Sequence, residues 1–356
     1  MFKPTVLVTG SAGHLGKALM LALPELGYNP IGIDIKASQT TTSVGSITDT
    51  AFLASIFDAH KPDHVIHAAT LHKPHVGSHS KTDFVQTNIA GTLALLEAAA
   101  PPSSSTSSTL AGRTVKSFVF ISTTSAFGAA LSSPPGQPAV WIHESVEPVP
   151  KNIYGVTKTA AEDVCRLVNK QTGLPVIVLR TSRFFPEEDD DEERRGEVTD
   201  GENLKVLELA YRRVDIADVV SACVCAMRRG AEGAVKWGKY IISAPTPFKK
   251  DAATLERLGT GNADEVFSEL VPGIDTLFRE KGWRFLRRID RVYDSQLAMR
   301  REELRWNPEY TFERAIERLE RGEEWRSELS FKVGKLGYHD VPTGVYTTEK
   351  KAQDGQ

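Results

Sequence analysis

The chain has few cysteines, no strong excess of either charge and no apolar run of membrane-spanning length. Its three cysteines, Cys165, Cys223 and Cys225, are too few for a disulfide framework, so we expect a reducing compartment and a cytoplasmic location. Lys and Arg number 43 and Asp and Glu 46, which leaves a formal net charge of −3 and no general attraction to nucleic acid or anionic membranes. One of the longest apolar stretches, Val219 to Met227, is far too short to cross a bilayer. An apolar run already begins at Thr5, so we expect no secretory leader.

Short β-branched runs alternate with helical patterns through the first half of the chain. The runs predict strands at residues 5–8, 30–34, 64–67, 117–121 and 176–179. The intervening patterns predict helices at residues 16–26, 51–60, 84–100 and 153–172. This alternation favours right-handed βαβ crossovers and a parallel sheet. After Arg180 the pattern breaks up, and the last third of the chain is helix-rich and strongly charged.

Two segments of unusual composition interrupt this alternation. Residues 101–113 are rich in Ser, Thr and Pro and are most simply a surface loop. Residues 187–193 are seven consecutive acids, followed by Arg194 and Arg195. Because like charges at this density repel, a solvated loop is the simplest interpretation of the acidic run. A cation site and a repulsive lip over a substrate pocket stay open as alternatives.

A glycine motif follows the first strand directly and opens the first helix. Gly10 can take the tight turn, Gly13 lets the backbone approach a pyrophosphate, and Gly16 allows close packing of the helix on the strand. The start of the helix then offers free N–H groups to phosphates. Asp34 ends the second strand, where a carboxylate accepts hydrogen bonds from ribose hydroxyls and repels a 2′-phosphate, which favours NAD over NADP. Lys36 lies close enough to keep NADP open as an alternative.

Further motifs follow in order along the chain. They are His67-Ala68-Ala69-Thr70, Asn88-Ile89-Ala90-Gly91-Thr92, Ser122 to Gly128, and Tyr154-Gly155-Val156-Thr157-Lys158. With the glycine motif, these segments resemble the extended short-chain dehydrogenase/reductase superfamily, specifically its NAD-dependent epimerase/dehydratase branch. The resemblance covers about residues 5–245, and residues 294–308 are similar to the closing segment of that family.

The resemblance implies a Rossmann-type, doubly wound parallel sheet that binds NAD. The cofactor-binding residues that it implies are Gly10, Gly13, His14, Leu15, Gly16, Asp34, Ser46, Ile47, Ala68, Ala69, Thr70, Asn88, Tyr154 and Lys158. Ser46 and Ile47 stand where the family usually has an acid and an aliphatic residue beside adenine, so this contact is expected to be weaker. The family also implies a homodimer formed through the helices at 84–100 and 153–172.

Tyr154 and Lys158 are four residues apart, so they share one face of the predicted helix. An unperturbed phenol has a pKa of about 10 and is a poor base at neutral pH. The Lys158 ammonium and the positive nicotinamide ring of NAD both favour the phenolate, so we expect them to make Tyr154 a usable acid and base. By resemblance, Lys158 also binds the nicotinamide ribose, and Thr123 holds the reacting oxygen. Family members that are 4,6-dehydratases carry Asp-Glu directly after this threonine, whereas Thr124 and Ser125 stand here, which argues against that reaction.

Residues after the sheet strands are candidates for substrate contact. The candidates are His72, Thr124 and Arg183. Arg183 stands where sugar-nucleotide enzymes of the family usually have Asn; it could bind a phosphate or carboxylate, or neutralise the neighbouring acidic run. A cluster of basic residues in the C-terminal region could receive a diphosphate or form a solvated basic face. These residues are Arg287, Arg288 and Arg291.

Other patterns are more simply structural. The histidines at positions 60, 64, 67, 72, 75 and 79 straddle a strand and a loop rather than one helical face, so we expect no metal site. Cys223 and Cys225 lie in an apolar helix and are expected in the core. Asp218 is expected to be a structural cap rather than a catalyst.

We therefore expect an α/β protein of two parts. Residues 1–180, with 211–245 returning to them, would form an NAD-binding domain, residues 181–210 and 246–335 a smaller, mostly helical substrate-binding domain, and residues 336–356 a tail. The leading hypothesis is an NAD-dependent epimerase-like oxidoreductase acting on a secondary alcohol of a sugar nucleotide or related small molecule. The alternatives are an NAD(P)-dependent dehydrogenase or reductase of a non-nucleotide carbonyl or alcohol, and a non-catalytic NAD-sensing protein.

Overall fold

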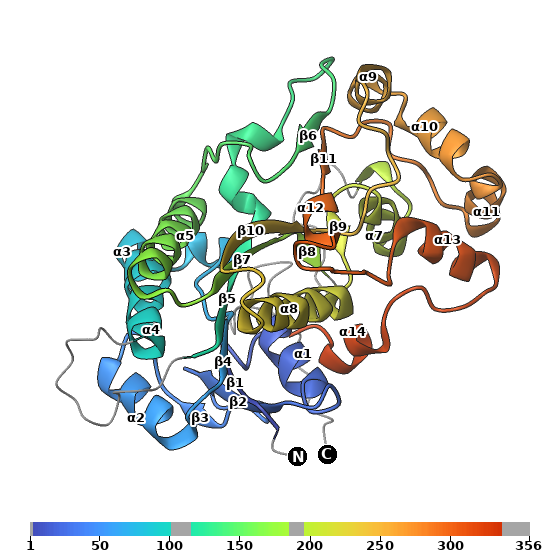
Figure 1. The fold of residues 1–356 in the computed structure, drawn as a ribbon. Helices are drawn as coiled ribbons and strands as arrows, with labels where there is room; N and C mark the ends of the chain where they lie inside the picture. Colours follow the sequence, from blue (N-terminus) through green and yellow to red (C-terminus); the bar gives the residue numbers. More distant parts are fainter. Residues whose placement is uncertain (1–2, 101–114, 185–195, 337–356) are drawn as a thin grey trace, which may run out of the picture.

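A seven-stranded parallel sheet is the centre of the molecule. The computed structural model describes residues 3–100, 115–184 and 196–336 (Figure 1). The strand order is β10-β7-β5-β4-β1-β2-β3, and every neighbouring pair is parallel. The strands are β1 Thr5–Thr9, β2 Asn29–Asp34, β3 Ser43–Val44, β4 His64–His67, β5 Ser117–Thr123, β7 Val176–Thr181 and β10 Trp237–Ile242. The strand order reverses between β1 and β4, and ligands of open parallel sheets bind beyond the carboxyl ends of the strands at such a point.

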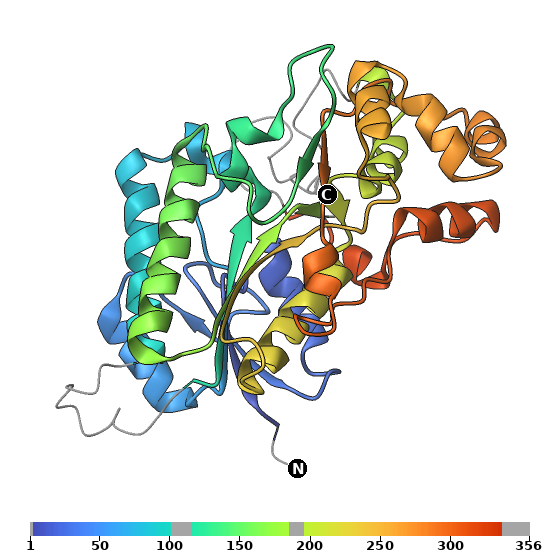
Figure 2. The ribbon, with the colours of Figure 1, turned by 45° about the horizontal axis from the view of Figure 1, so that its top comes forward.

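Helices cover both faces of this sheet. Helices α2, α4 and α5 lie on one face, and α1 and α8 lie on the other (Figures 1 and 2). The helices flanking the sheet are α1 His14–Ala22, α2 Thr50–His60, α3 Lys81–Val85, α4 Gly91–Ala99, α5 Ile153–Thr172 and α8 Ile216–Ala231. The expected Rossmann-type, doubly wound α/β fold is thus confirmed.

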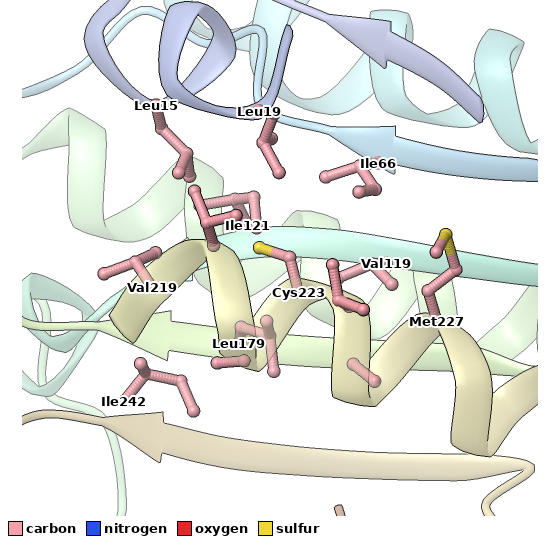
Figure 3. Packing of buried hydrophobic residues seen from close by; sticks show 14 of the residues in the cluster. Leu15, Leu19, Ile66, Val119, Ile121, Leu179, Val219, Cys223, Met227 and Ile242 are labelled. Atoms are coloured by element: carbon pink, nitrogen blue, oxygen red, sulfur yellow. The ribbon is translucent and has the colours of Figure 1, made fainter. Parts of the chain in front are cut away.

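Alternate residues of the strands fill two separate cores. On β5, Val119 and Ile121 point into the core under α1 and α8, whereas Phe118 and Phe120 point into the core under α2, α4 and α5. Burial on both faces explains why these strands are continuous apolar runs. Figure 3 shows the first core, in which side chains from both helices meet those of β4, β5, β7 and β10. Its labelled residues are Leu15, Leu19, Ile66, Val119, Ile121, Leu179, Val219, Cys223, Met227 and Ile242.

The C-terminal part adds a third, largely helical core. Its helices are α7 Gly201–Leu209, α9 Ala252–Thr260, α10 Ala263–Leu270, α11 Ile274–Lys281 and α13 Phe312–Glu320, which bury a shared apolar cluster. Two short parallel pairs, β6 Val140–Ile142 with β11 Arg291–Tyr293 and β8 Arg183–Phe184 with β9 Arg213–Val214, complete the strands. The remaining helices are α12 Gln296–Met299 and α14 Glu328–Val333. The division into domains at the boundaries given above stays a prediction.

The helix predicted at 84–100 is interrupted. It begins as α3 and passes through a π-helical turn, η2 Gln86–Ala90, before α4 starts at Gly91. The Asn88 side chain turns inward at this turn and bonds to Leu71, outside the helix, while Thr92 Oγ1 donates to the Asn88 carbonyl at 2.7 Å. A π-turn of this kind often marks a functional position.

Asp215, rather than Asp218, caps helix α8. The Asp215 carboxylate accepts the Ala217 N–H at 2.8 Å, as an N-cap does. Asp218 accepts the N–H groups of Glu309 and Tyr310, each at 2.8 Å, and so fastens the C-terminal segment to α8. Burial raises the pKa of Asp218 to about 7. Its role is structural, as expected, but it is not the cap.

The remaining sequence-based expectations have mixed outcomes. Cys223 is buried in the core, and Cys225 is half-buried against it. Residues 101–113 and 187–193, expected to be surface loops, lie outside the described residues. Across the ranges that the structure describes, no helix is long and apolar enough to cross a membrane.

Candidate active site

The three glycines of the motif, Gly10 and Gly13 in the turn after β1 and Gly16 inside α1, are explained by different structural requirements. Gly10 has a φ of +72°, and a Cβ there would lie 2.7 Å from the Ala69 nitrogen. A Cβ on Gly16 would lie 1.9 Å from the Gly10 carbonyl oxygen, so only glycine permits this packing of α1 on β1. A Cβ on Gly13 would meet only the Gly10 oxygen, at 3.4 Å. Packing therefore does not require glycine at position 13, whose open space leaves room for an approaching ligand beside its place as the N-cap of α1.

Asp34 lies directly beside this turn. One carboxylate oxygen accepts the Ala12 N–H at 3.0 Å, and the other accepts the Lys36 N–H at 2.9 Å. Both bonds come from backbone groups, and a carboxylate has about four acceptor sites, so capacity remains for ligand hydroxyls. A negative charge at this place disfavours a 2′-phosphate. The turn and Asp34 together fit a dinucleotide with a free ribose 2′-hydroxyl.

The side chains of His14 and Leu15 contact other parts of the protein rather than the space beside the glycine turn. His14 Nε2 accepts the Leu336 N–H at 2.9 Å, and Leu15 packs in the core of Figure 3. Both residues stand in the first turn of α1, the end of a helix at which backbone N–H groups point towards a bound phosphate. The groups that these two residues can offer a phosphate are therefore their backbone N–H groups.

Ser46 and Ile47, the expected adenine contacts, lie beside the start of α4. Ile47 is buried, and a Cβ on Gly91 would lie 2.8 Å from its Cδ1. The Ser46 hydroxyl shares a hydrogen bond of 2.8 Å with that of Thr48. Gly91 is thus explained by the close approach of Ile47, and the contact with adenine stays a prediction.

The segment after β4 borders the glycine turn. The Ala69 N–H donates to Thr9 Oγ1 at 3.1 Å, and the Ala68 N–H donates to the Thr9 carbonyl at 3.3 Å. Because Gly10 follows Thr9 and its α-carbon faces Ala69, the ends of β1 and β4 form one continuous surface. The predicted cofactor residues from these two strands are therefore neighbours.

Asn88 fixes this segment to helix α5. Its Oδ1 accepts from Thr70 Oγ1 at 2.9 Å and from the Leu71 N–H at 2.8 Å. Its Nδ2 donates to the Leu71 carbonyl at 2.8 Å and to Thr157 Oγ1 at 3.0 Å. The π-turn in the predicted helix exists where this side chain reaches inward, and it links the expected cofactor segment to the helix of Tyr154.

Tyr154 and Thr123 are brought together at the carboxyl end of β5. Asn152 caps α5 by accepting the Gly155 N–H at 3.0 Å, which starts the helix just before Tyr154. The side chains of Tyr154 and Thr123 are both buried, and the Thr123 hydroxyl acts on Tyr154 by slightly lowering the pKa of its phenol. Thr123 Oγ1 also accepts the Ser125 N–H at 3.1 Å, so the threonine hydroxyl has its own proton to donate.

Burial decides the titration of the two ionisable groups on α5. It raises the pKa of Tyr154 to about 12, against a smaller lowering by the hydrogen bond from Thr123. It lowers the pKa of Lys158 to about 7, although Cys165 and Glu162 act in the opposite direction. Lys158 Nζ donates to the Ile121 carbonyl at 2.6 Å and lies 4.0 Å from the centre of the Phe120 ring. The expected lowering of the phenol pKa is thus outweighed by burial, and a phenolate at neutral pH needs further positive charge.

Sequence reasoning missed Glu162. It lies on α5 four residues after Lys158, and its carboxylate is fully buried among Ser122, Arg180 and Lys239. The sequence did contain a signal: Glu162 follows Tyr154 and Lys158 at intervals of four residues, which places a glutamate on the buried face of an amphipathic helix.

The candidate substrate residues lie on separate elements. Thr124 is buried at the first position of the 3₁₀ helix η3 Thr124–Phe127, directly after Thr123. Arg183 is half-buried in β8, beyond the carboxyl end of β7. His72 precedes the 3₁₀ helix η1 Lys73–Gly77, and its N–H donates to His75 Nδ1 at 3.1 Å. All three follow the sheet strands, as expected for residues near a site at this edge.

Arg288 and Arg291 do not form a solvated face, and the diphosphate interpretation of the C-terminal arginines stays a prediction. Arg288 Nη2 donates to the Ser133 carbonyl at 2.6 Å, and Arg291 forms a bidentate pair with Asp290. These two guanidinium groups hold the chain together, whereas Arg287 is exposed. Among the described residues, no three His, Cys, Asp or Glu side chains are placed to hold a metal ion.

The comparison with known proteins identifies the family. The model of the NAD dependent epimerase/dehydratase family matches residues 6–238. UDP-glucose 4-epimerase of Rhizobium leguminosarum bv. trifolii is 32% identical over 183 residues, 49% of this chain and 50% of that protein. UDP-glucuronate 4-epimerase 3 of Arabidopsis thaliana is 23% identical over 324 residues, 83% of this chain and 69% of that protein. The match to the first of these relatives thus spans about half of its length.

Solved structures share the fold at low sequence identity. A short-chain dehydrogenase/reductase superfamily protein from Agrobacterium tumefaciens, solved with bound NAD, has a TM-score of 0.59 at 19% identity and covers 89% of this chain and 97% of its own. UDP-glucose 4-epimerase from Thermotoga maritima has a TM-score of 0.56 at 23% identity and covers 87% and 95%. The glycine turn and Asp34 fit NAD, which is the cofactor of the matched family, so the predicted cofactor is confirmed. With more than half of its length matched, the chain belongs to the NAD dependent epimerase/dehydratase family.

Proposed function

We propose that the protein is an epimerase-like oxidoreductase that acts on a secondary alcohol of a nucleotide sugar or a related small molecule. The observation that carries this proposal is the placement of two buried side chains, Tyr154 at the start of α5 and Thr123 at the carboxyl end of β5. The Thr123 hydroxyl is close enough to lower the pKa of Tyr154 slightly. Family membership and relatives named as UDP-glucose and UDP-glucuronate 4-epimerases support the same reaction class.

Different residues of the chain would bind the cofactor, orient the substrate and transfer the proton. The glycine turn, Asp34 and the segment fixed by Asn88 would hold NAD, which supplies a hydride acceptor when bound. Thr123 Oγ1 orients the substrate hydroxyl, and Tyr154 Oη takes its proton. Because burial holds the pKa of Tyr154 near 12, the phenolate depends on the positive charge of Lys158 and of the oxidised cofactor. An epimerase must return a proton to the same oxygen, so Tyr154 serves as base and then as acid.

We propose that 4,6-dehydration is not the reaction. A relative named dTDP-D-glucose 4,6-dehydratase, from Dictyostelium discoideum, is 28% identical over 207 residues, 52% of this chain and 45% of that protein, so family membership alone does not decide. Elimination needs an acid and a base beside the oxidised carbon. The residues here are Thr124 and Ser125, whose hydroxyls do not titrate near neutral pH.

The remaining assignments are proposals of the same kind. Thr124, Arg183 and His72 would contact substrate, because they follow the strand ends at the site's edge of the sheet. A homodimer through the helices at 81–99 and 153–172 is supported by apolar side chains left exposed there, Val85 on α3 with Val156 and Leu167 on α5. A cytoplasmic location agrees with the free thiols.

The test is an NMR assay of UDP-hexoses, UDP-hexuronates and UDP-N-acetylhexosamines with the purified protein and no added cofactor. We expect the wild type to interconvert 4-epimers and to form no 4-keto-6-deoxy product. Tyr154→Phe should lose activity by about 10²- to 10⁴-fold, the usual contribution of an acid–base group. Tyr310→Phe, which removes the hydroxyl of a tyrosine held in the C-terminal segment, is the matched control and should retain activity.

Two results would replace the proposal by its alternatives. Oxidation of added NADH or NADPH with a simple carbonyl, without epimer interconversion, would indicate a reductase. Binding of NAD with the same ligand responses in wild type and Tyr154→Phe, and no turnover, would indicate a sensor.

A further inference from the structure

The carboxylate of Glu162 is bound by three different strands. Ser122 Oγ donates to Oε1 at 2.6 Å, and Arg180 donates through Nε to Oε1 at 2.9 Å and through Nη2 to Oε2 at 2.6 Å. Lys239 Nζ donates to Oε2 at 3.0 Å. These donors belong to β5, β7 and β10, so one buried side chain fastens α5 to three neighbouring strands of the sheet.

This anchor lies immediately beside the candidate catalytic groups. Glu162 stands one turn after Lys158 and two turns after Tyr154, on the same buried face of α5. Ser122 precedes Thr123 on β5, and the Arg180 guanidinium lies 4.7 Å from the Phe127 ring in η3, the turn that follows Thr123. The Glu162 carboxylate therefore joins the helix of Tyr154 to the strand of Thr123.

The charges around Lys158 give the anchor a second effect. Glu162 and Cys165 face Lys158 from its own helix, and burial strongly raises the pKa of Cys165, which keeps it a neutral thiol at neutral pH. From β4 comes His67, whose pKa is lowered to about 3 by burial and then by Lys158, so it is neutral. From β5, the Phe120 ring and the Ile121 carbonyl contact the Lys158 ammonium. Tyr154, whose pKa is raised by burial, lies one turn before Lys158 on α5.

Glu162 itself is ionised. Burial alone would raise its pKa, but the hydrogen bond and charge of Arg180, the charge of Lys239 and the hydrogen bond from Ser122 together lower it. The cations Arg180 and Lys239 lie beyond the carboxylate, from β7 and β10. Among the groups that surround Lys158, Glu162 thus supplies the opposing negative charge.

We propose that Glu162 is a positioning residue of this site: its carboxylate holds the Tyr154–Lys158 turn of α5 against the Thr123 end of β5 and favours the cationic form of the Lys158 side chain. The catalytic role of Lys158 rests on the function proposed above. The effect of Glu162 on the charge of Lys158 does not depend on that function. Glu162 touches neither substrate nor cofactor in this scheme and acts through Lys158.

The test measures the titration of Lys158 directly, by NMR of the full chain labelled with ¹³Cε-lysine. Lys158→Met identifies the resonance by its loss. Glu162→Gln keeps the shape of the side chain but removes its charge, so the Lys158 midpoint should fall by about one pH unit or more. Lys239→Met removes a cation from the other side of the carboxylate, so the midpoint should rise. The Lys239 side chain is 24% exposed, which makes this variant the safer one for folding.

Opposite shifts are the signature that packing alone would not produce. Unchanged midpoints, or shifts of the same sign in both variants, would overturn the proposal. If Glu162→Gln does not fold, the rise in Lys239→Met decides alone, and its absence counts against the proposal. The pH profile of kcat in Glu162→Gln should shift with the midpoint while KM stays near the wild-type value. A wild type without epimerase activity that still shows opposite shifts would refute the proposed function and support this role of Glu162.

Discussion

Replacing Gly16 by alanine is expected to destabilise the folded protein, whereas replacing Gly13 by alanine is expected to weaken the binding of NAD. Both substitutions add one methyl group to the glycine motif, at the N-cap of α1 for Gly13 and inside the helix for Gly16. The added Cβ at Gly16 would lie 1.9 Å from the Gly10 oxygen and 2.7 Å from the Ser11 α-carbon, which are backbone atoms that cannot rotate away. At Gly13 the nearest atom is the Gly10 oxygen, at 3.4 Å. Comparing the two variants therefore separates the packing of α1 on β1 from the access of the dinucleotide to the turn.

The magnitudes follow from these contacts. Overpacking of this kind costs about 3 kcal/mol, because α1 must move away from β1 or distort. With an unfolding entropy of ~0.7 kcal/mol per kelvin for a chain of this length, Gly16→Ala should lower Tm by about 4 °C. Gly13 is the N-cap of α1, where alanine is a poor substitute, so Gly13→Ala should cost no more than about 1 kcal/mol and ~1 °C.

Calorimetric unfolding without added nucleotide and NAD titration of each variant make the comparison. A methyl group where a pyrophosphate approaches should weaken NAD binding by Gly13→Ala at least about tenfold, or ~1.4 kcal/mol. The reasoning would be refuted if Gly13→Ala lowered Tm as much as Gly16→Ala. It would also be refuted if Gly13→Ala bound NAD as tightly as the wild type.

Two further substitutions test other parts of the site. Asp34→Ser removes the carboxylate beside the glycine turn, so the preference for NAD over NADP should fall by tenfold or more; equal Kd ratios in both proteins would argue against a ribose contact. Lys158→Met tests its buried charge, because the pKa of Lys158 is about 7 in the folded protein and 10.5 is its ordinary value. Between these values the unfolded chain binds more protons, so wild-type stability rises with pH, by up to ~5 kcal/mol in total. In Lys158→Met, the free energy of unfolding measured with denaturant should no longer rise between pH 7 and 10.5, and it should exceed the wild-type value at pH 7. An unchanged dependence on pH would show that Lys158 is not its source.

The strands and one helix could be predicted closely because their signals are local. Strands β1, β4, β5 and β7 are buried on both faces, and so their sequences are short runs rich in β-branched and aromatic residues. Helix α5 has its predicted bounds, Ile153–Thr172, since Asn152 caps its start and Gly173, at a φ of +75°, ends it. The break at Gln86–Ala90 was not predictable, because it depends on contacts of Asn88 with residues distant in sequence.

The candidate site divides in the same way. The meeting of Tyr154 with Thr123 follows from the helix and the strand end that the motifs predict. The pKa of Tyr154 was expected to fall, yet it rises, because the degree of burial is a property of the whole fold rather than of the Tyr154–Lys158 spacing. The anchor at Glu162 joins residues 122, 162, 180 and 239, which only the strand order brings together.

The nucleotide released when the purified protein is denatured is the most direct measure of the proposed function. An epimerase that uses its cofactor transiently should retain it, so mass spectrometry should find NAD, close to one molecule per chain, with no cofactor added during purification. Release of NADP, or of no dinucleotide by a protein that also fails to bind NAD in calorimetry, would contradict the proposal.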